Sequence, residues 1–243
     1  PWIDVGDLRR IGMYLADKKP DVIVQIGDFA DMPSLSSYDV GKKSFEGRRY
    51  ADDINTCKDG METLLDPIWQ EQSRLRSNKK SVYAPRMILT LGNHEDRISR
   101  AVNSDPKLDG TMGLDDLGYS RYGWEVYPFL EVVVVNGVAF SHYFPSGSLG
   151  RPCISARATL LKMHMSCVAG HQQGRDIAYG KRADGSEVTC IISGSCYEHD
   201  ESYLNPQTNM HWRGLYLLHD VHNGSFDEMA VSLSYLRKKY GSN

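Results

Sequence analysis

The chain has 243 residues, and its 28 Lys and Arg against 31 Asp and Glu give a formal charge of −3. Hydrophobic residues make up 41% of the chain and charged residues 24%. These ordinary globular values exclude a disordered chain, a collagen and a simple coiled coil. The near-neutral balance also excludes a protein that binds nucleic acid by bulk charge, although it leaves room for a local basic patch.

Cysteine usage and hydropathy indicate the redox environment of the protein and whether it contacts a membrane. The five cysteines form no C-x-x-C pair, which favours reduced thiols in a cytoplasmic protein over a zinc ribbon or a redox dithiol. The longest strongly apolar run, residues 130–135, is far shorter than the roughly 20 residues that cross a bilayer. We therefore expect no membrane partner.

The first third of the chain predicts a helix followed by two buried strands. Leu8, Ile11 and Leu15 have helical spacing, and a Lys-Lys-Pro stop follows them. The apolar runs at 21–26 and 87–91 are typical of buried parallel strands. Each run ends in a polar cluster, at the end of the strand where open α/β sheets gather their functional groups.

Residues 32–86, between these strands, predict a helical insert on the same face as the strand ends. Apolar residues recur at helical spacing from Ile54 to Trp69. Cations precede this pattern at 42–49 and follow it at 74–80. A solvated surface is the simpler interpretation of these cations, and a track for nucleic acid is the alternative.

The second half of the chain predicts hairpins. Strand patterns at 130–135 and 138–142 flank Asn136-Gly137, a strong signal for a tight hairpin turn. A helix is expected over 156–165 and a short strand over 166–169, and further strands flank two more turn dipeptides. This order predicts a single domain over 1–243, in which two sheets face each other with helices outside.

Four short polar clusters each follow a predicted strand. A lone histidine at a strand end is more often structural, but four ordered clusters are hard to explain by packing alone. Asp, His and Asn together suit a site for two divalent cations, which at about 3.5–4 Å apart can hold a phosphate ester and activate water. The clusters are Gly27-Asp28-Phe29-Ala30-Asp31, Gly92-Asn93-His94-Glu95-Asp96, Ser141-His142-Tyr143 and Gly170-His171-Gln172-Gln173.

The order GD-x-x-D, GNHE-D, H, GH-x-(H/Q) resembles the calcineurin-like metallophosphoesterase superfamily, from residue 1 to about 200. The resemblance implies a four-layer αββα sandwich of two mixed β-sheets flanked by helices. It also implies a hydrolase acting on ester bonds, whose dinuclear metal centre cleaves phosphate mono- or diesters as a phosphatase, phosphodiesterase or nuclease. The expected cofactor is a pair of divalent metal ions, with Mn²⁺ preferred and Mg²⁺, Fe, Zn²⁺ and Ni²⁺ as alternatives.

The resemblance also implies roles for individual residues. Asp28 resembles the bridging carboxylate, and His94 resembles the catalytic histidine that contacts the phosphate and assists the leaving group. Asp31 is expected among the catalytic residues, in a supporting position behind the groups that contact metal or substrate, with a turn or helix cap as the equal alternative. The ligands implied for the second metal are Asn93, His142 and His171.

Two features depart from the family pattern. Gln173 stands where the family has its last histidine ligand, so a weaker first metal site is expected there, or a glutamine that acts through water. The family also opens with a strand that ends in D-x-H, and counting back from Asp28 runs off the sequence. We expect that strand upstream of residue 1.

The residues around the motifs suggest a substrate surface. Arg97 could reach a substrate phosphate, with a salt bridge to Glu95 or Asp96 as the simpler alternative, and Tyr143 is expected to line the pocket. DNA, RNA or a nucleotide is considered as substrate. The pattern is also similar to phage-encoded members, which would place the protein in the host cytoplasm. The competing hypothesis is a catalytically impaired binding module that keeps the fold.

Overall fold

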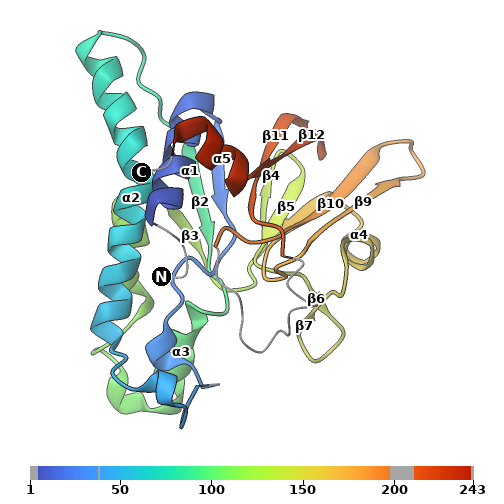
Figure 1. Ribbon diagram of the computed structural model, residues 1–243. Coiled ribbons are helices and arrows are strands. Elements are labelled where there is room, and N and C mark those ends of the chain that lie inside the picture. Colours follow the sequence, from blue (N-terminus) through green and yellow to red (C-terminus); the bar gives the residue numbers. More distant parts are fainter. Residues whose placement is uncertain (1–4, 38, 198–210, 242–243) are drawn as a thin grey trace.

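The computed structural model describes residues 5–37, 39–197 and 211–241, which form an α/β structure of sheets and helices (Figure 1). The predicted α/β class is confirmed. The α-helices are α1 (Val5–Lys18), α2 (Tyr50–Ser77), α3 (Asp96–Ser104), α4 (Ala156–Met163) and α5 (Leu233–Tyr240). The strands are β1 (Val22–Gln25), β2 (Arg86–Thr90), β3 (Glu125–Tyr127), β4 (Val133–Val135), β5 (Val138–Ser141), β6 (Pro145–Ser146), β7 (Arg151–Pro152), β8 (Cys167–Ala169), β9 (Arg175–Lys181), β10 (Glu187–Ser193), β11 (Gly214–His222) and β12 (Ser225–Ser232).

The first sheet has the order β1-β2-β3, and its strands are parallel. The central strand β2 is covered on both faces: Ile88 packs toward the second sheet, whereas its neighbour Leu89 packs toward the helices. Both side chains are fully buried. This explains why β2 reads as a continuous apolar run rather than as an alternating one.

The second sheet has the order β4-β5-β8-β10-β9, with parallel inner strands and antiparallel edges. Asn136 and Gly137 join β4 to β5 with φ of 47° and 85°, the two positive angles that a type I′ hairpin turn requires. The hairpin is therefore confirmed. However, β4 begins at Val133 rather than at 130, because Leu130 takes a φ of 66° and Glu131 N–H closes a turn onto Pro128 O.

Buried side chains form three clusters between these elements. One lies between the first sheet and α1, α2 and α5, and a second lies between the two sheets, where β12 also contributes. The third lies between the second sheet and α4. Figure 1 accordingly shows α1 and α2 on one side of the sheets and α4 on the other. Among the described helices, none combines the length and the apolar character that crossing a membrane requires.

The helical segment between β1 and β2 differs from the expected insert at the strand ends. Helix α2 has 28 residues, about 42 Å at 1.5 Å per residue. Near its beginning Asp53 accepts a hydrogen bond from Ser34 N–H (2.9 Å), and near its end Gln72 donates to Tyr83 O (2.9 Å). The helix therefore returns the chain along the first sheet, and it buries an apolar face there because residues such as Met61 recur at helical spacing.

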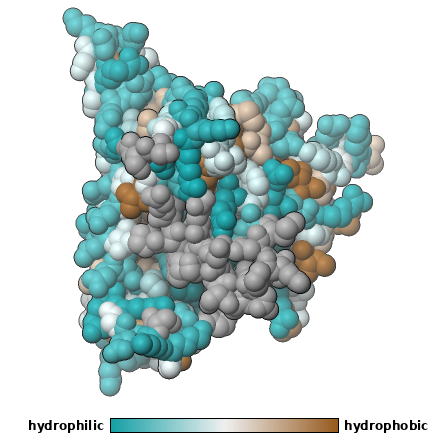
Figure 2. All heavy atoms as spheres, in the orientation of Figure 1, coloured by the Kyte–Doolittle hydropathy of each residue, from teal (hydrophilic) through white to brown (hydrophobic). Residues whose placement is uncertain are grey.

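The cations of this segment consequently lie at opposite ends of α2. Before the helix, Arg48 and Lys42 both pair with Asp39. At its other end Arg74 pairs with Glu71. On the face drawn in Figure 2 the surface of α2 is largely hydrophilic at both ends. The solvated-surface interpretation fits this arrangement better than one continuous track for nucleic acid does.

Candidate metal centre

The four polar clusters meet at the carboxyl ends of strands from both sheets. Asp28 follows β1 and Asn93 follows β2, whereas His142 follows β5 and His171 follows β8. Asp28 Oδ2 lies 3.3 Å from His142 Nε2, and Asn93 Oδ1 lies 2.8 Å from His171 Nδ1. Both contacts join one sheet to the other, so the site lies on the seam between them.

The turn that carries Asp28 is held by a buried carboxylate. Glu95 accepts backbone hydrogen bonds from Asp28 (2.9 Å), Ala30 (2.8 Å) and Gly92 (2.9 Å). The two backbones approach so closely that a Cβ on Gly92 would lie 2.3 Å from Asp28 N. Only glycine fits there. Asp28 itself takes a φ of 58°, a left-handed conformation that Asp tolerates better than most residues.

Four donor atoms converge in front of this turn. The ligand atoms of Asp28, His142 and His171 lie within 4.8 Å of one another. Asn93 Oδ1 adds a fourth donor, 2.9 Å from His142 Nε2, and the two imidazoles approach to 3.2 Å. Among the described residues, Asp28, His142 and His171 form the one cluster of Asp, Glu, His and Cys side chains with the spacing of a metal site.

Proton accounting shows why a cation suits this cluster. His142 Nδ1–H donates to Ile26 O (2.7 Å), so a neutral His142 presents a lone pair at Nε2. That lone pair faces Asp28 Oδ2, Asn93 Oδ1 and His171 Nδ1. While His142 is neutral, at most one proton, on His171 Nδ1, serves these contacts; without a cation, a second proton on His142 Nε2 is the other way to satisfy Asp28. More electron pairs than protons converge on one point, as in a ligand set.

The pKa shifts reflect the same crowding. Burial opposes the charge on Asp28, but hydrogen bonding and attraction from His142 outweigh burial and hold the pKa of Asp28 well below its usual range. Burial likewise opposes the charge on His142, and the carboxylate of Asp28 raises the pKa of His142 in return. For His171, burial and the neighbouring His142 lower the pKa, so His171 keeps a lone pair at neutral pH.

The predicted catalytic pair is also close. His94 Nδ1 lies 2.6 Å from Asp31 Oδ1, and His94 Nε2 lies 3.9 Å from Asp28 Oδ2. Burial alone would lower the pKa of His94, but the hydrogen bond to Asp31 and the charge of Asp28 raise it. Asp31 thus orients the imidazole and favours its protonated form. The N-cap residue of the following 3₁₀ turn is Met32, which makes no side-chain capping hydrogen bond.

Arg97 does not form the salt bridge expected with Glu95 or Asp96. Its guanidinium donates to Asp31 O (2.7 Å) and lies 3.6 Å from Asp31 Oδ1, because α3 turns this side chain toward the β1 turn. Its Nη2 comes within 3.3 Å of His94 Nε2. Asp96 pairs instead with Arg100 (3.2 Å).

Of two further predicted residues, Tyr143 lies next to the cluster, whereas Gln173 is not hydrogen-bonded to it. The ring of Tyr143 stands 4.9 Å from that of His171, and Tyr143 lines the adjoining pocket. Among the described residues, no hydrogen bond joins the side chain of Gln173 to the cluster. Its Oε1 is buried and has no hydrogen-bond partner among the described residues, and its backbone carbonyl accepts from Trp212 N–H (3.3 Å).

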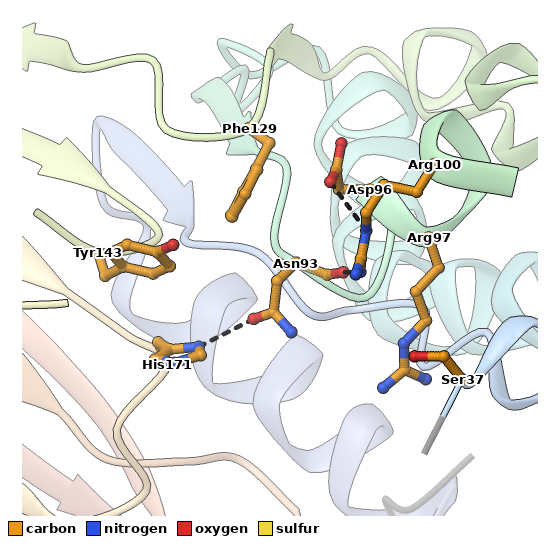
Figure 3. Close-up of a pocket in the computed structure, with 8 residues that line it drawn as sticks. All are labelled: Ser37, Asn93, Asp96, Arg97, Arg100, Phe129, Tyr143 and His171. Atoms are coloured by element: carbon orange, nitrogen blue, oxygen red, sulfur yellow. Dashed lines mark hydrogen bonds and ion pairs between the residues drawn. The ribbon is translucent and has the colours of Figure 1, made fainter. Parts of the chain in front are cut away.

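A pocket of about 290 Å³ opens beside the four donors (Figure 3). Sequence reasoning did not assign several of its residues. Asp96 directly follows the GNHE motif, and Arg100 stands one helical turn later on α3, a spacing that could have suggested them, but no motif marks the other two. The lining residues that were not assigned are Ser37, Asp96, Arg100 and Phe129.

Comparison with known proteins gave one similarity. The chain is 34% identical over 70 residues to the Gene 54 protein of Mycobacterium phage L5. The match covers 29% of this chain and 26% of that protein, about a quarter of its length. No family model matches the sequence. No solved structure matches it either.

Proposed function

We propose that this chain is a divalent-cation-dependent phosphoesterase of the calcineurin-like metallophosphoesterase type. The observation that carries the proposal is the convergence of Asp28, Asn93, His142 and His171 from two sheets, with His94 beside them. The clusters on both sides of the two sheets and between them support the four-layer αββα sandwich. The similarity to a phage protein supports a phage-encoded enzyme.

The donor set suits a divalent cation with mixed nitrogen and oxygen ligands. Two imidazoles, one carboxylate and one amide oxygen favour Mn²⁺, with Fe, Zn²⁺ and Ni²⁺ also suited and Mg²⁺ less so. When bound, such a cation would neutralise charge on a phosphoryl group and lower the pKa of water. A second cation beside Asp28 remains part of the proposal, with Gln173 as the candidate ligand.

The side chains beside the cluster would handle the ester itself. Asp31 holds the Nδ1 side of His94, which leaves Nε2 facing the site and able to give a proton to the leaving oxygen. Arg97 is anchored by the carboxylate and the carbonyl of Asp31 and by Met32 O, so its guanidinium is positioned for a phosphoryl oxygen. Phosphate mono- or diesters, including nucleotides, are the substrate class.

The test is hydrolysis of an aryl phosphate diester and of the matching monoester with and without Mn²⁺. Asp28→Asn keeps the size of the side chain and tolerates the positive φ, whereas Ala would add backbone strain. We expect Asp28→Asn to reduce turnover to the Mn²⁺-free level and His94→Ala to lower it roughly a hundredfold or more. Exposed His219 on β11 provides the matched control, since His219→Ala should leave turnover unchanged.

Metal content separates this proposal from a catalytically impaired binding module. That alternative is favoured by Gln173, whose side-chain Oε1 accepts no hydrogen bond from the described residues and so is not tied to the four donors. Two Mn²⁺ per chain with turnover support the enzyme. Cation binding that depends on Asp28, without hydrolysis of either ester, would support the binding module and contradict the enzyme.

A further inference from the structure

The pocket beside the candidate metal centre has two chemically different sides. In Figure 3, Tyr143 and Phe129 stand on one side and Arg97 and Arg100 on the other, with Asn93 between them. Tyr143 and Phe129 offer aromatic surface. The arginines offer two positive groups within the same space of about 290 Å³.

The aromatic side is fixed before any ligand arrives. The rings of Phe129 and Tyr143 meet edge to face, with centroids 5.7 Å apart and planes at 78°. The phenol of Tyr143 donates to Gly150 O (3.1 Å). Leu130, next to Phe129, takes a φ of 66°, a conformation that is strained for leucine and marks a constrained turn. The half-buried phenyl ring of Phe129 is therefore held at the pocket by a turn whose backbone is strained at Leu130.

The cationic side is fixed as well. Arg100 donates from Nη2 to Asn93 O (2.8 Å) and pairs through Nε with Asp96 (3.2 Å). Its guanidinium is thereby held beside the backbone of a candidate ligand, although half of the side chain remains exposed. A planar guanidinium held in this way can bind an anionic oxygen or stack on a planar ring.

From these two sides we infer that the pocket selects a mononucleotide, whose base stacks on Phe129 while Arg97 and Arg100 hold its phosphate. This inference rests on the proposed function and names its substrate class. Aromatic rings bind bases of any sequence through their faces. A single nucleotide is favoured over a strand because the cations near α2 pair with Asp39 and Glu71 at opposite ends of that helix.

The experiment measures binding rather than turnover. Calorimetry with Mn²⁺ present compares a hydrolysis-resistant phosphonate analogue of adenosine 5′-monophosphate with the matching ribose 5-phosphonate. We expect the base to strengthen binding roughly ten- to hundredfold. Phe129→Leu keeps an apolar side chain without the ring, so it should remove that gain. Tyr179→Leu, at an exposed tyrosine on β9, should preserve it.

Other outcomes would overturn the inference. Equal affinity for the two phosphonates, no binding of the nucleotide analogue, or a gain that survives Phe129→Leu would each do so. Tighter binding of a single-stranded oligonucleotide, with steep salt dependence, would replace the mononucleotide by a strand. Failure of the proposed function is read separately, as the absence of Mn²⁺-dependent hydrolysis of the aryl esters. The selectivity can therefore fail while the phosphoesterase stands.

Discussion

At the scale of single residues, Glu95 organises the site without lining the pocket. Both of its oxygens are occupied: Oε2 accepts from the backbone of Asp28 and Gly92, and Oε1 accepts from Ala30 N–H and the Tyr119 hydroxyl. The side chain is fully buried. It ties the turn after β1 to the turn after β2, and so sets the distance between their candidate ligands.

Glu95→Gln should therefore destabilise the protein although it is nearly isosteric. The new amide would point N–H groups at backbone N–H donors, so at least one buried donor loses its partner. We expect a loss of about 3 kcal/mol in the free energy of unfolding, measured by urea denaturation. Exposed Glu131 serves as control, and Glu131→Gln should stay within about 0.5 kcal/mol. Equal stability of the two variants would contradict this role.

The sequence predicted the identity of the clustered residues better than their pairings. Asp28, Asn93, His94, His142 and His171 could be found because each stands in a short motif after a strand. The partner of Arg97 could not be found, because it depends on where α3 aims the side chain. Phe129 was missed for a similar reason. A turn between two strands brings it to the pocket, and no local pattern records that placement.

At the scale of elements, helix α2 is connected to the site through a line of buried polar groups. Cys57 Sγ on α2 contacts the Tyr119 hydroxyl (3.4 Å), which donates to Glu95 Oε1 (3.2 Å). Burial raises the pKa of Cys57 to about 12. The reactivity of the Cys57 thiol therefore shows whether α2 stays packed on the sheet.

Cys57 should resist alkylation in the folded protein. At pH 8 a thiol of pKa about 12 is ionised about a thousandfold less than a free cysteine, and the thiolate is the reactive form. Labelling with iodoacetamide, followed by mass spectrometry of the Cys57 peptide, should be slower by at least that factor than in urea. Native labelling as fast as in urea would show that α2 is not held as described.

Elements that are determined by neighbouring residues could be predicted from the sequence, whereas elements that depend on distant contacts could not. The hairpin at Asn136-Gly137 was predicted because both residues accept positive φ. Strand β3 was not, since its three residues, Glu125–Tyr127, form a strand only by pairing with β2. The path of α2 was also missed. Periodicity shows that a helix forms, but only the sheet it covers determines where the helix lies.

At the scale of the whole molecule, the two described ends of the chain are joined by a buried ion cluster. Asp7 on α1 pairs with Arg10 (2.9 Å) and with Arg237 Nε on α5 (2.9 Å). Arg10 also donates to Gly241 O (2.8 Å). Asp17 joins the same two helices through Lys239 (2.6 Å), but that pair is largely exposed.

These two acidic residues allow a matched comparison of burial. Asp7→Ala leaves Arg10 buried without its carboxylate, so we expect a loss of about 3–5 kcal/mol. Asp17→Ala removes an exposed pair and should cost about 1 kcal/mol or less. Urea denaturation of both variants measures the difference. Similar losses for both would mean that the Asp7 cluster does not hold α5 against α1.

Because the candidate ligands come from both sheets, a cation bound by them would also stabilise the fold. His142 and His171 lie 49 and 78 residues from Asn93 along the chain, so a bound cation would act as a reversible cross-link that closes long loops. Part of its binding free energy would then be folding free energy. A substitution deep between the sheets, at Ile88 or Phe140, would consequently register as weaker cation affinity, although neither residue touches the ion.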